Sequence, residues 1–297
     1  MVRIPMTRRF GTFAAAGVVA LGLGLAGCGE ECNCEELVTD TGTNGDSGTD
    51  TSSTVDTGEE DDTDDELFEF TEEFDGPGLD GWSVPDRDVG AGKADADHAS
   101  ISEGLLLLDT SWGGEDPEHN NQEIWYAGNV ESVDSFKYGT FSTRLRAPAD
   151  SSTICRFSLS DRVDISGDGQ HPDTYVLNAI SFEIYDEELV IRSYKQWRPD
   201  DGEAGGPTHE AFRMTPFEFD FSDWHTFEVV WTEMKASLFV DGTHMVDIVD
   251  TAPEVMLHAD FAHFSYNDEW NGGTPSKEDR PTCEVDYFRG EGIFRLR

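Results

Sequence analysis

Short apolar segments alternate with polar turns along this chain from residue 67 onward. Within 141–146, polar side chains separate Phe141, Thr143 and Leu145, which is the period of two of a strand with one buried face. Segments of this kind are predicted to be strands: Leu105–Leu108, Tyr138–Arg146, Ile154–Leu159, Ile180–Tyr185, Leu189–Tyr194, Phe227–Trp231, Ser237–Val240 and Val285–Phe288. Gly, Pro, Asp and Asn separate them, and no segment has a convincing helical stripe. The pattern predicts an all-β domain over 67–297, a β-sandwich or barrel.

The first 28 residues have a different pattern. Arg3, Arg8 and Arg9 precede an apolar run from Phe13 to Leu25. That run is too short to cross a bilayer and is typical of a secretory signal peptide. It closes with Leu-Ala-Gly-Cys, which matches the bacterial lipobox, so we expect cleavage after residue 27 and a lipid on Cys28. The alternative is an ordinary signal peptide with an incidental cysteine.

Residues 28–66 contain no Lys or Arg and almost no large apolar side chain. Such a segment buries too little surface to offset the entropy lost on folding, and its like charges repel. We therefore expect a disordered, extended acidic tether; an acidic calcium-binding repeat is the alternative, with irregular spacing against it. The expected location is extracytoplasmic, as a lipoprotein anchored to a membrane through Cys28 at the cell surface or in the periplasm.

The net charge of the chain excludes some classes of binding partner. The formal net charge is −42. Nucleic-acid binding needs a basic face that neutralises phosphate, and none is visible in the sequence, so nucleic acid is not an expected partner. An anionic membrane surface would repel the chain, which leaves a covalent or apolar attachment. The wealth of Asp and scarcity of Lys also indicate a salty habitat.

The chain has five cysteines. With Cys28 assigned to the lipid, Cys155 and Cys283 are the expected disulfide, because an oxidising compartment permits one and both residues lie in predicted strands. Cys32 and Cys34 lie beside the anchor and have no assigned partner. No CxxC pair or His cluster indicates zinc.

Several short motifs occur in a fixed order along the domain. They are Glu103-Gly104-Leu105, Gln122-Glu123-Ile124, Tyr-Gly-Thr-Phe at 138–141, Trp-His-Thr-Phe at 224–227, Val-Asp-Gly at 240–242 and Val-Asp-Tyr-Phe-Arg at 285–289. In this order they resemble glycoside hydrolase family 16, which contains laminarinases, lichenases and xyloglucan transferases. The resemblance covers about residues 67–297. It implies a concanavalin-like jelly roll of two antiparallel sheets and a β-glucan-like polysaccharide as partner.

The family hydrolyses β-glycosidic bonds with retention, through carboxylates in the pattern E-x-D-x-E on one strand. Alternate strand residues share a face, and retention requires two carboxyl groups about 5–5.5 Å apart. The best-matching segment here is 178–185. By resemblance, Ala179 stands at the nucleophile position, Ser181 at the middle Asp and Glu183 at the acid/base, with Tyr185 on the same cleft face. The catalytic motif is therefore degenerate.

A rival register lays Arg162–Gly167 on a longer form of the motif. It retains Asp164 but places Arg162 and Gly167 where the two Glu belong. Neither register has both carboxylates, and a lone Glu cannot form and then release a glycosyl intermediate.

Three functions remain as alternatives. The first is a surface-anchored, non-hydrolytic polysaccharide-binding protein. The second is an active retaining β-glucanase or transglycosylase on β-1,3 or β-1,4 glucans, using Glu183 and a displaced carboxylate from Asp173, Glu187 or Glu188. The third is a structural or adhesive surface protein without a sugar ligand.

Sugar sites combine aromatic faces with polar groups that bind hydroxyls. The candidates here are Trp125 with Glu123, Trp197 and Trp270, and core packing is the alternative for each aromatic ring. The resemblance also implies a possible structural calcium, held by Asp286 and the carbonyl of Gly104, both of which supply oxygen. The alternative for Asp286 is a buried carboxylate that bonds backbone amides. No cofactor is required for activity.

Overall fold

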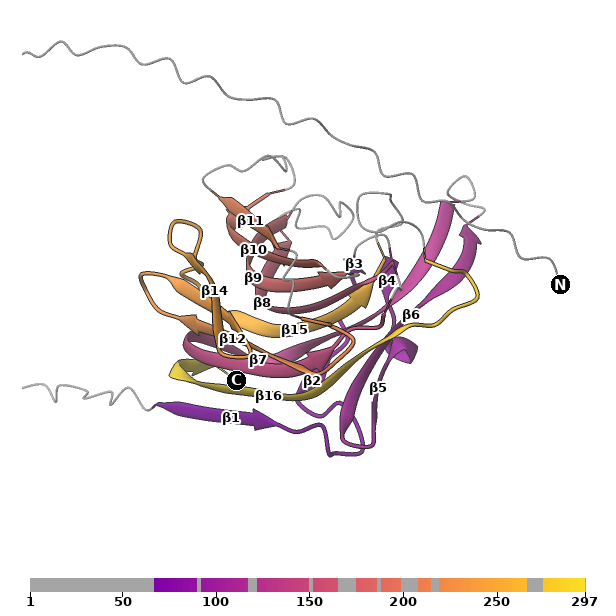
Figure 1. The fold of residues 1–297 in the computed structure, drawn as a ribbon, viewed down its shortest axis with the longest axis horizontal. Coiled ribbons are helices and arrows are strands. Elements are labelled where there is room, and N and C mark those ends of the chain that lie inside the picture. The colour runs from indigo at the N-terminus through magenta and orange to yellow at the C-terminus, as the bar shows by residue number, and fades with distance from the viewer. Residues whose placement is uncertain are drawn as a thin grey trace, which may run out of the picture. The chain divides into compact units, whose positions relative to one another are not determined.

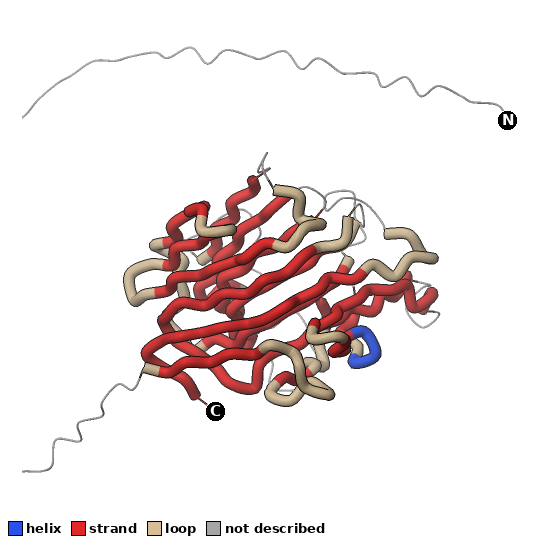
Figure 2. The backbone as a smooth tube through the Cα atoms, turned by 60° about the horizontal axis from the view of Figure 1, so that its bottom comes forward, coloured by secondary structure: helices blue, strands red, loops and turns tan. Residues whose placement is uncertain are grey.

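The computed structural model describes residues 67–89, 92–116, 122–149, 152–164, 175–185, 188–198, 208–214, 219–265 and 275–296. The expected signal peptide, the acidic tether, Cys28, Cys32 and Cys34 lie outside the described residues. Within those ranges no helix is long and apolar enough to cross a membrane. The single helical element described there is a short 3-10 turn, η1 (Ala96–His98), seen at the edge of the sheets in Figure 2.

Sixteen strands make up the rest of the described secondary structure. They are β1 (Phe68–Glu72), β2 (Trp82–Ser83), β3 (Asp88–Val89), β4 (Gly92–Ala94), β5 (Ala99–Ser102), β6 (Leu105–Asp116), β7 (Gln122–Arg146), β8 (Ile154–Asp164), β9 (Tyr175–Tyr185), β10 (Glu188–Trp197), β11 (His209–Met214), β12 (His225–Trp231), β13 (Ala236–Val240), β14 (Thr243–Ile248), β15 (Leu257–Phe264) and β16 (Thr282–Leu296). Every strand predicted from the sequence lies within one of these.

The strands form two layers that share β7 (Figure 1). The layer named here the front sheet has the order β7, β15, β8, β9, β10 and β11, and all its pairings are antiparallel. The back sheet has the order β14, β13, β12, β7 and β16, with β1 and β6 beside β16. The predicted sandwich of two antiparallel sheets is confirmed.

The Tyr-Gly pair of the 138–141 motif marks the bend at which β7 leaves the front sheet for the back sheet. Tyr138 has φ 57° and Gly139 has φ 143°. A side chain at Gly139 would lie 2.1 Å from the carbonyl oxygen of Glu291 on β16. Glycine is therefore required here by the approach of two backbones as well as by the positive φ.

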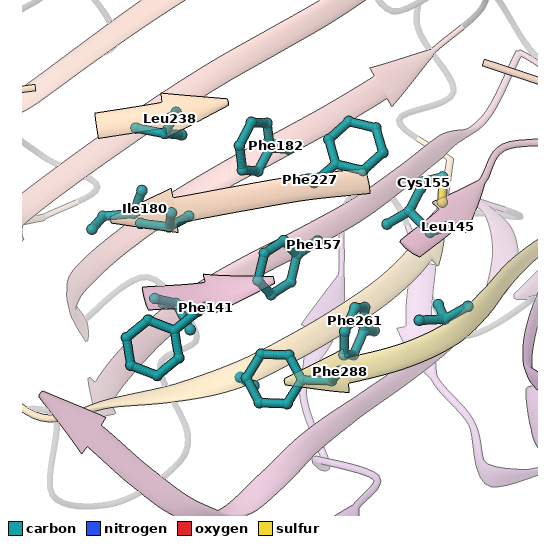
Figure 3. Packing of buried hydrophobic residues seen from close by; sticks show 14 of the residues in the cluster. Phe141, Leu145, Cys155, Phe157, Ile180, Phe182, Phe227, Leu238, Phe261 and Phe288 are labelled. Carbon is teal, nitrogen blue, oxygen red and sulfur yellow. The ribbon is translucent and has the colours of Figure 1, made fainter. Parts of the chain in front are cut away.

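Phenylalanine rings fill the space between the sheets (Figure 3). Phe182 of the front sheet meets Phe227 of the back sheet at 5.2 Å between ring centroids, and Phe157 meets Phe288 at 6.0 Å. Ile180 and its period-two neighbours on β9 are also in this core, as the alternation predicted. Each fully buried ring contributes roughly 1.5–3 kcal/mol to the free energy of unfolding.

A disulfide ties the two sheets together. It joins Cys155 of β8 to Cys283 of β16, with 5.7 Å between their Cα atoms, and both residues are buried in the core. Another contact stabilises the end of the back sheet itself. His225 bonds the carboxylate of Asp241 at 2.6 Å, and Asp241 and Gly242, both with positive φ, form the two-residue turn between β13 and β14.

Candidate functional site

The side chains of the front sheet alternate between the core and the opposite side, which we call the far face. On β9 the far face carries Ala179, Ser181, Glu183 and Tyr185, because Ile180, Phe182 and Ile184 are in the core. All four are buried, with exposed fractions of 3–5%. The segment that resembles the family's catalytic strand thus lies near the middle of the front sheet, between β8 and β10.

Glu183 is paired with arginine. The Nε of Arg192 on β10 donates a hydrogen bond of 2.9 Å to Glu183 Oε2. Arg156 on β8 is directly opposite Glu183 in the strand register. The remaining acid of the motif is therefore an ion-pair partner in a crowded, largely buried setting.

Asp260 on β15 is the most deeply buried carboxylate of the far face, with no exposed surface. It accepts hydrogen bonds from Arg156 at 2.6 Å, Asn129 at 3.0 Å and Ser158 at 3.2 Å, and also from Arg87. Burial alone would raise the pKa of Asp260, but the charges of Arg156 and Arg87 outweigh it and hold the pKa below its ordinary value. Asp260 is therefore an ionised counter-charge rather than a proton donor.

Glu183 and Asp260 do not form a catalytic pair. Strand β8 separates their strands, so the strands lie about 10 Å apart. Asp260 is opposite Ser158, and Ser158 is opposite Ser181, two residues from Glu183. The two backbones are therefore about 12 Å apart, and each carboxylate is bonded to a different guanidinium. Retaining chemistry needs about 5–5.5 Å between carboxyl groups.

The alternative alignment of the motif, on residues 162–167, does not supply a pair of carboxylates either. Arg162 lies on the far face of β8, with its guanidinium carbon 3.7 Å from the centre of the Tyr175 ring. The side chain of Asp164, and residues 165–167, 173 and 187, lie outside the described residues. Glu188 is described, and it forms an ion pair of 3.2 Å with Arg213.

Aromatic rings gather beyond the charged part of the far face. Trp197 is half-buried, 5.4 Å from the ring of Tyr194 and 6.0 Å from that of Tyr175. Tyr194 stacks on His209 at 4.4 Å. Burial, and next the charge of Glu183, raise the pKa of Tyr194 to about 12, so its hydroxyl stays protonated at neutral pH. The Trp197 predicted for sugar binding therefore lies on the same face as Glu183, and Trp270 lies outside the described residues.

The placement of Trp125 corrects an expectation. Its side chain is 1% exposed, so its ring offers no face to a sugar. It lies on a part of β7 that is an interior strand, with β6 along one edge and β4 along the other. Its neighbour Glu123 is half-buried and forms an ion pair with Lys277.

The residues expected at a calcium site do not fit one. Asp286 forms an ion pair of 3.1 Å with Arg144, so a guanidinium already occupies the place of a cation. Gly104 has φ 78° in the turn between β5 and β6. Across the described ranges, no group of three or more His, Cys, Asp or Glu could hold a metal ion, whereas calcium takes six to eight oxygen ligands.

Sequence reasoning missed the arginine network. Arg87, Arg156, Arg192 and Arg213 come from separate places in the chain, and their carboxylate partners on β15, β9 and β10 are equally scattered. The one local signal was period two in β8, where Arg156 and Ser158 alternate with the core residues Cys155, Phe157 and Leu159.

No protein-family model matches the chain, and no curated protein is similar to it in sequence. Solved structures do share its fold. A lichenase derived from a mouse hindgut metagenome has 17% identity and a TM-score of 0.57, covering 76% of this chain and 99% of its own. The laminarinase catalytic domain of Thermotoga maritima has 16% identity and a TM-score of 0.55, covering 76% and 97%. The κ-carrageenase of Pseudoalteromonas carrageenovora, in complex with a κ-carrageenan oligotetrasaccharide, has 18% identity and a TM-score of 0.54, covering 76% and 93%.

These similarities establish the fold. The chain has the concanavalin-like jelly roll of the family 16 glycoside hydrolases, as its motifs predicted.

Proposed function

We propose that this chain is a surface-anchored polysaccharide-binding protein that does not hydrolyse glycosidic bonds by the two-carboxylate mechanism. Polysaccharide as the partner is supported by the neighbours in fold, among them a lichenase, a laminarinase and a carrageenase bound to an oligosaccharide. The half-buried Trp197 and its aromatic neighbours on the far face are suited to pack on the C–H surface of a sugar.

The observation that supports the absence of hydrolysis in this proposal is the composition of β9. Ala179 and Ser181 supply no carboxylate, and Glu183 is bonded to Arg192 at 2.9 Å. Ala179 has no group that can attack an anomeric carbon. A glycosyl-enzyme intermediate therefore has no nucleophile on this strand.

Anchoring rests on the lipobox at Cys28 and the acidic tether that follows it. We expect the lipid to hold the chain on a membrane outside the cytoplasm and the tether to extend the domain from it. Replacing Cys28 by Ser should move the protein from the membrane fraction to the soluble fraction, and retention in the membrane would contradict the anchor.

One paired experiment tests the function. The full mature chain, purified in detergent, is run in native gels containing laminarin, lichenan, xyloglucan, agarose or κ-carrageenan, and the same mixtures are assayed for new reducing ends. We expect retardation by at least one polysaccharide and no reducing ends.

Two outcomes would overturn the proposal. Reducing ends that disappear in Glu183→Gln would establish the alternative, a retaining glucanase or transglycosylase with a displaced carboxylate. No retardation by any polysaccharide would leave a structural or adhesive protein.

A further inference from the structure

We infer that the far face of the front sheet binds a polysaccharide that carries negative charges, sulfate or carboxylate, and that guanidinium groups recognise them. This inference rests on the proposed function and names the class of ligand for the same face.

The first support is the contrast between this face and the rest of the protein. The chain has a formal net charge of −42, with 20 basic residues against 62 acidic ones. The far face nevertheless gathers Arg87, Arg156, Arg162, Arg192 and Arg213. The face is therefore rich in the groups that bind anions in proteins, although four of the five guanidiniums already have a carboxylate partner within the protein.

The second support is the depth at which each charge lies. The side chains of Arg87, Arg156 and Arg192 keep 17%, 21% and 15% of their surface exposed, and that of Arg213 keeps 40%. Asp260, by comparison, has no exposed surface, and the side chain of Glu183 keeps 6%. Asp260 and Glu183 therefore lie beneath the guanidiniums that they bond and orient them. The other two carboxylate partners are nearer to the surface, Glu131 with 22% and Glu188 with 32% of the side chain exposed.

The third support is the proximity of like charges. Burial lowers the pKa of Arg162, the charges of Tyr175 and Asp88 raise it, and those of Arg87 and Arg156 lower it. Arg162 is thus within electrostatic range of two other guanidiniums of the face, and a bound anion would lower the repulsion among them. The guanidinium carbon of Arg162 lies 3.7 Å from the centre of the Tyr175 ring, which holds this group in place.

The fourth support is a buried hydroxyl. Ser181 lies on the far face between Ser158 and Arg192 in the strand register. It is 3% exposed, and its Oγ has no hydrogen-bond partner among the described residues. Buried polar atoms normally have partners, so this hydroxyl is a donor left over beside the arginine row, for a ligand group that displaces what covers it.

The chemistry of the row selects the ligand. The planar fork of a guanidinium matches carboxylate and sulfate oxygens, and hydrogen bonds between charged groups are about twice as strong as neutral ones. Trp197 and Tyr194 lie beside the row and supply the aromatic faces that any sugar ring needs. A neutral glucan would use these rings but leave the guanidiniums without partners from the ligand.

The test compares polymers that share a backbone and differ in charge. The probes are laminarin with its sulfated and carboxymethylated derivatives, and agarose with κ-carrageenan, titrated into the full mature chain by calorimetry. We expect the charged member of at least one set to bind at least tenfold more tightly than its neutral parent. The sulfated and carboxymethylated arms distinguish the two anionic groups.

Arg162→Gln and Arg289→Gln form the matched pair of variants. Arg289 also lies over a tyrosine ring, at 4.2 Å from Tyr287, but on the back sheet. We expect Arg162→Gln to lose about tenfold in affinity for the charged polymer and little for the neutral one, and Arg289→Gln to change neither. Arg162→Lys, which keeps the charge, should lie between the wild type and Arg162→Gln.

The outcomes distinguish a failure of this inference from a failure of the proposed polysaccharide-binding function. Equal binding of neutral and charged polymers would overturn this inference and leave the proposed function intact, whereas binding of neither would overturn both. Preference for the charged polymer that survives in folded Arg162→Gln and Arg213→Gln would place the site elsewhere and also overturn the inference. Thermal unfolding of each variant shows whether it is folded.

Discussion

Asp260→Asn is the sharpest test of how the far face is held together. Asp260 has no exposed surface and accepts hydrogen bonds from Arg87, Arg156, Asn129 and Ser158. Asparagine keeps the shape of the side chain but removes its charge. Arg156 then loses the carboxylate that lies beneath it in a partly buried site, and Arg87 keeps only its second partner, Glu131, at 2.9 Å.

The magnitude follows from burial. Breaking a buried ion pair by removing one partner costs roughly 3–5 kcal/mol. The side chains of Arg87 and Arg156 keep 17% and 21% of their surface, so water relieves part of that cost. We therefore expect a loss near the lower end, about 3 kcal/mol of the free energy of unfolding. That is a large fraction of the roughly 5–15 kcal/mol typical of a domain.

The assay is urea unfolding at neutral pH, in which the midpoint should fall at an unchanged m-value. Asp247→Asn is the matched control, because Asp247 also accepts bonds from several groups, including Ser237 and Lys235, but lies at the surface of β14. Its replacement should cost much less, since exposed ion pairs are worth little. Equal losses in the two variants would refute the view that Asp260 is the counter-charge of the arginine network.

Further predictions concern the disulfide, a histidine and calcium. Replacing Cys155 and Cys283 by Ala should cost about 5 kcal/mol on the chain-entropy model for residues 128 apart, measured by urea unfolding beside the reduced wild type, and a cost below 1 kcal/mol would contradict it. Burial holds the pKa of His263 at about 4, below 6.5, so the unfolded chain binds the proton first and stability should fall from about pH 6.5 to 4, by about 3 kcal/mol. His263→Gln should reduce that slope, and an unchanged slope would assign it to other groups. Because Asp286 is already paired with Arg144, a calcium chelator should leave the melting temperature unchanged, and a fall reversed by calcium would show a site.

Much of the fold could be predicted because its signals are local. Period-two segments identified most of the central strands, and the Val-Asp-Gly motif at 240–242 coincides with a hairpin turn in which Asp241 and Gly242 both have positive φ. Most of the strands that went unpredicted are short or lie at edges, such as β2 (Trp82–Ser83) and β3 (Asp88–Val89). The exception is β15, which lies between β7 and β8 and carries polar residues at 258, 260 and 263 that interrupt its apolar pattern. The full length of β7 was not predicted either. Its bend at Gly139 depends on contact with β16, which lies about 150 residues further along the chain.

The site was only partly predictable, for a related reason. Alternation along β9 was enough to place Ala179, Ser181 and Glu183 on one face. The network around Asp260 joins residues 104 and 173 positions apart, and neither partner has a local motif. Only the order of the strands brings them together.

Ala179, at the position where the resemblance expects a nucleophile, shares the far face with the arginine network. A general acid must carry its proton on a carboxylate oxygen that faces the substrate, yet Arg192 donates a hydrogen bond to an oxygen of Glu183, and Arg156 lies opposite it. A sheet face arranged in this way stabilises negative charge, whether it belongs to Asp260 or to a bound ligand. A carboxylate placed at position 179 would supply an attacking group, but Glu183 would still accept the hydrogen bond of Arg192. Under the proposed function, these guanidiniums are the groups suited to hold an anionic polymer.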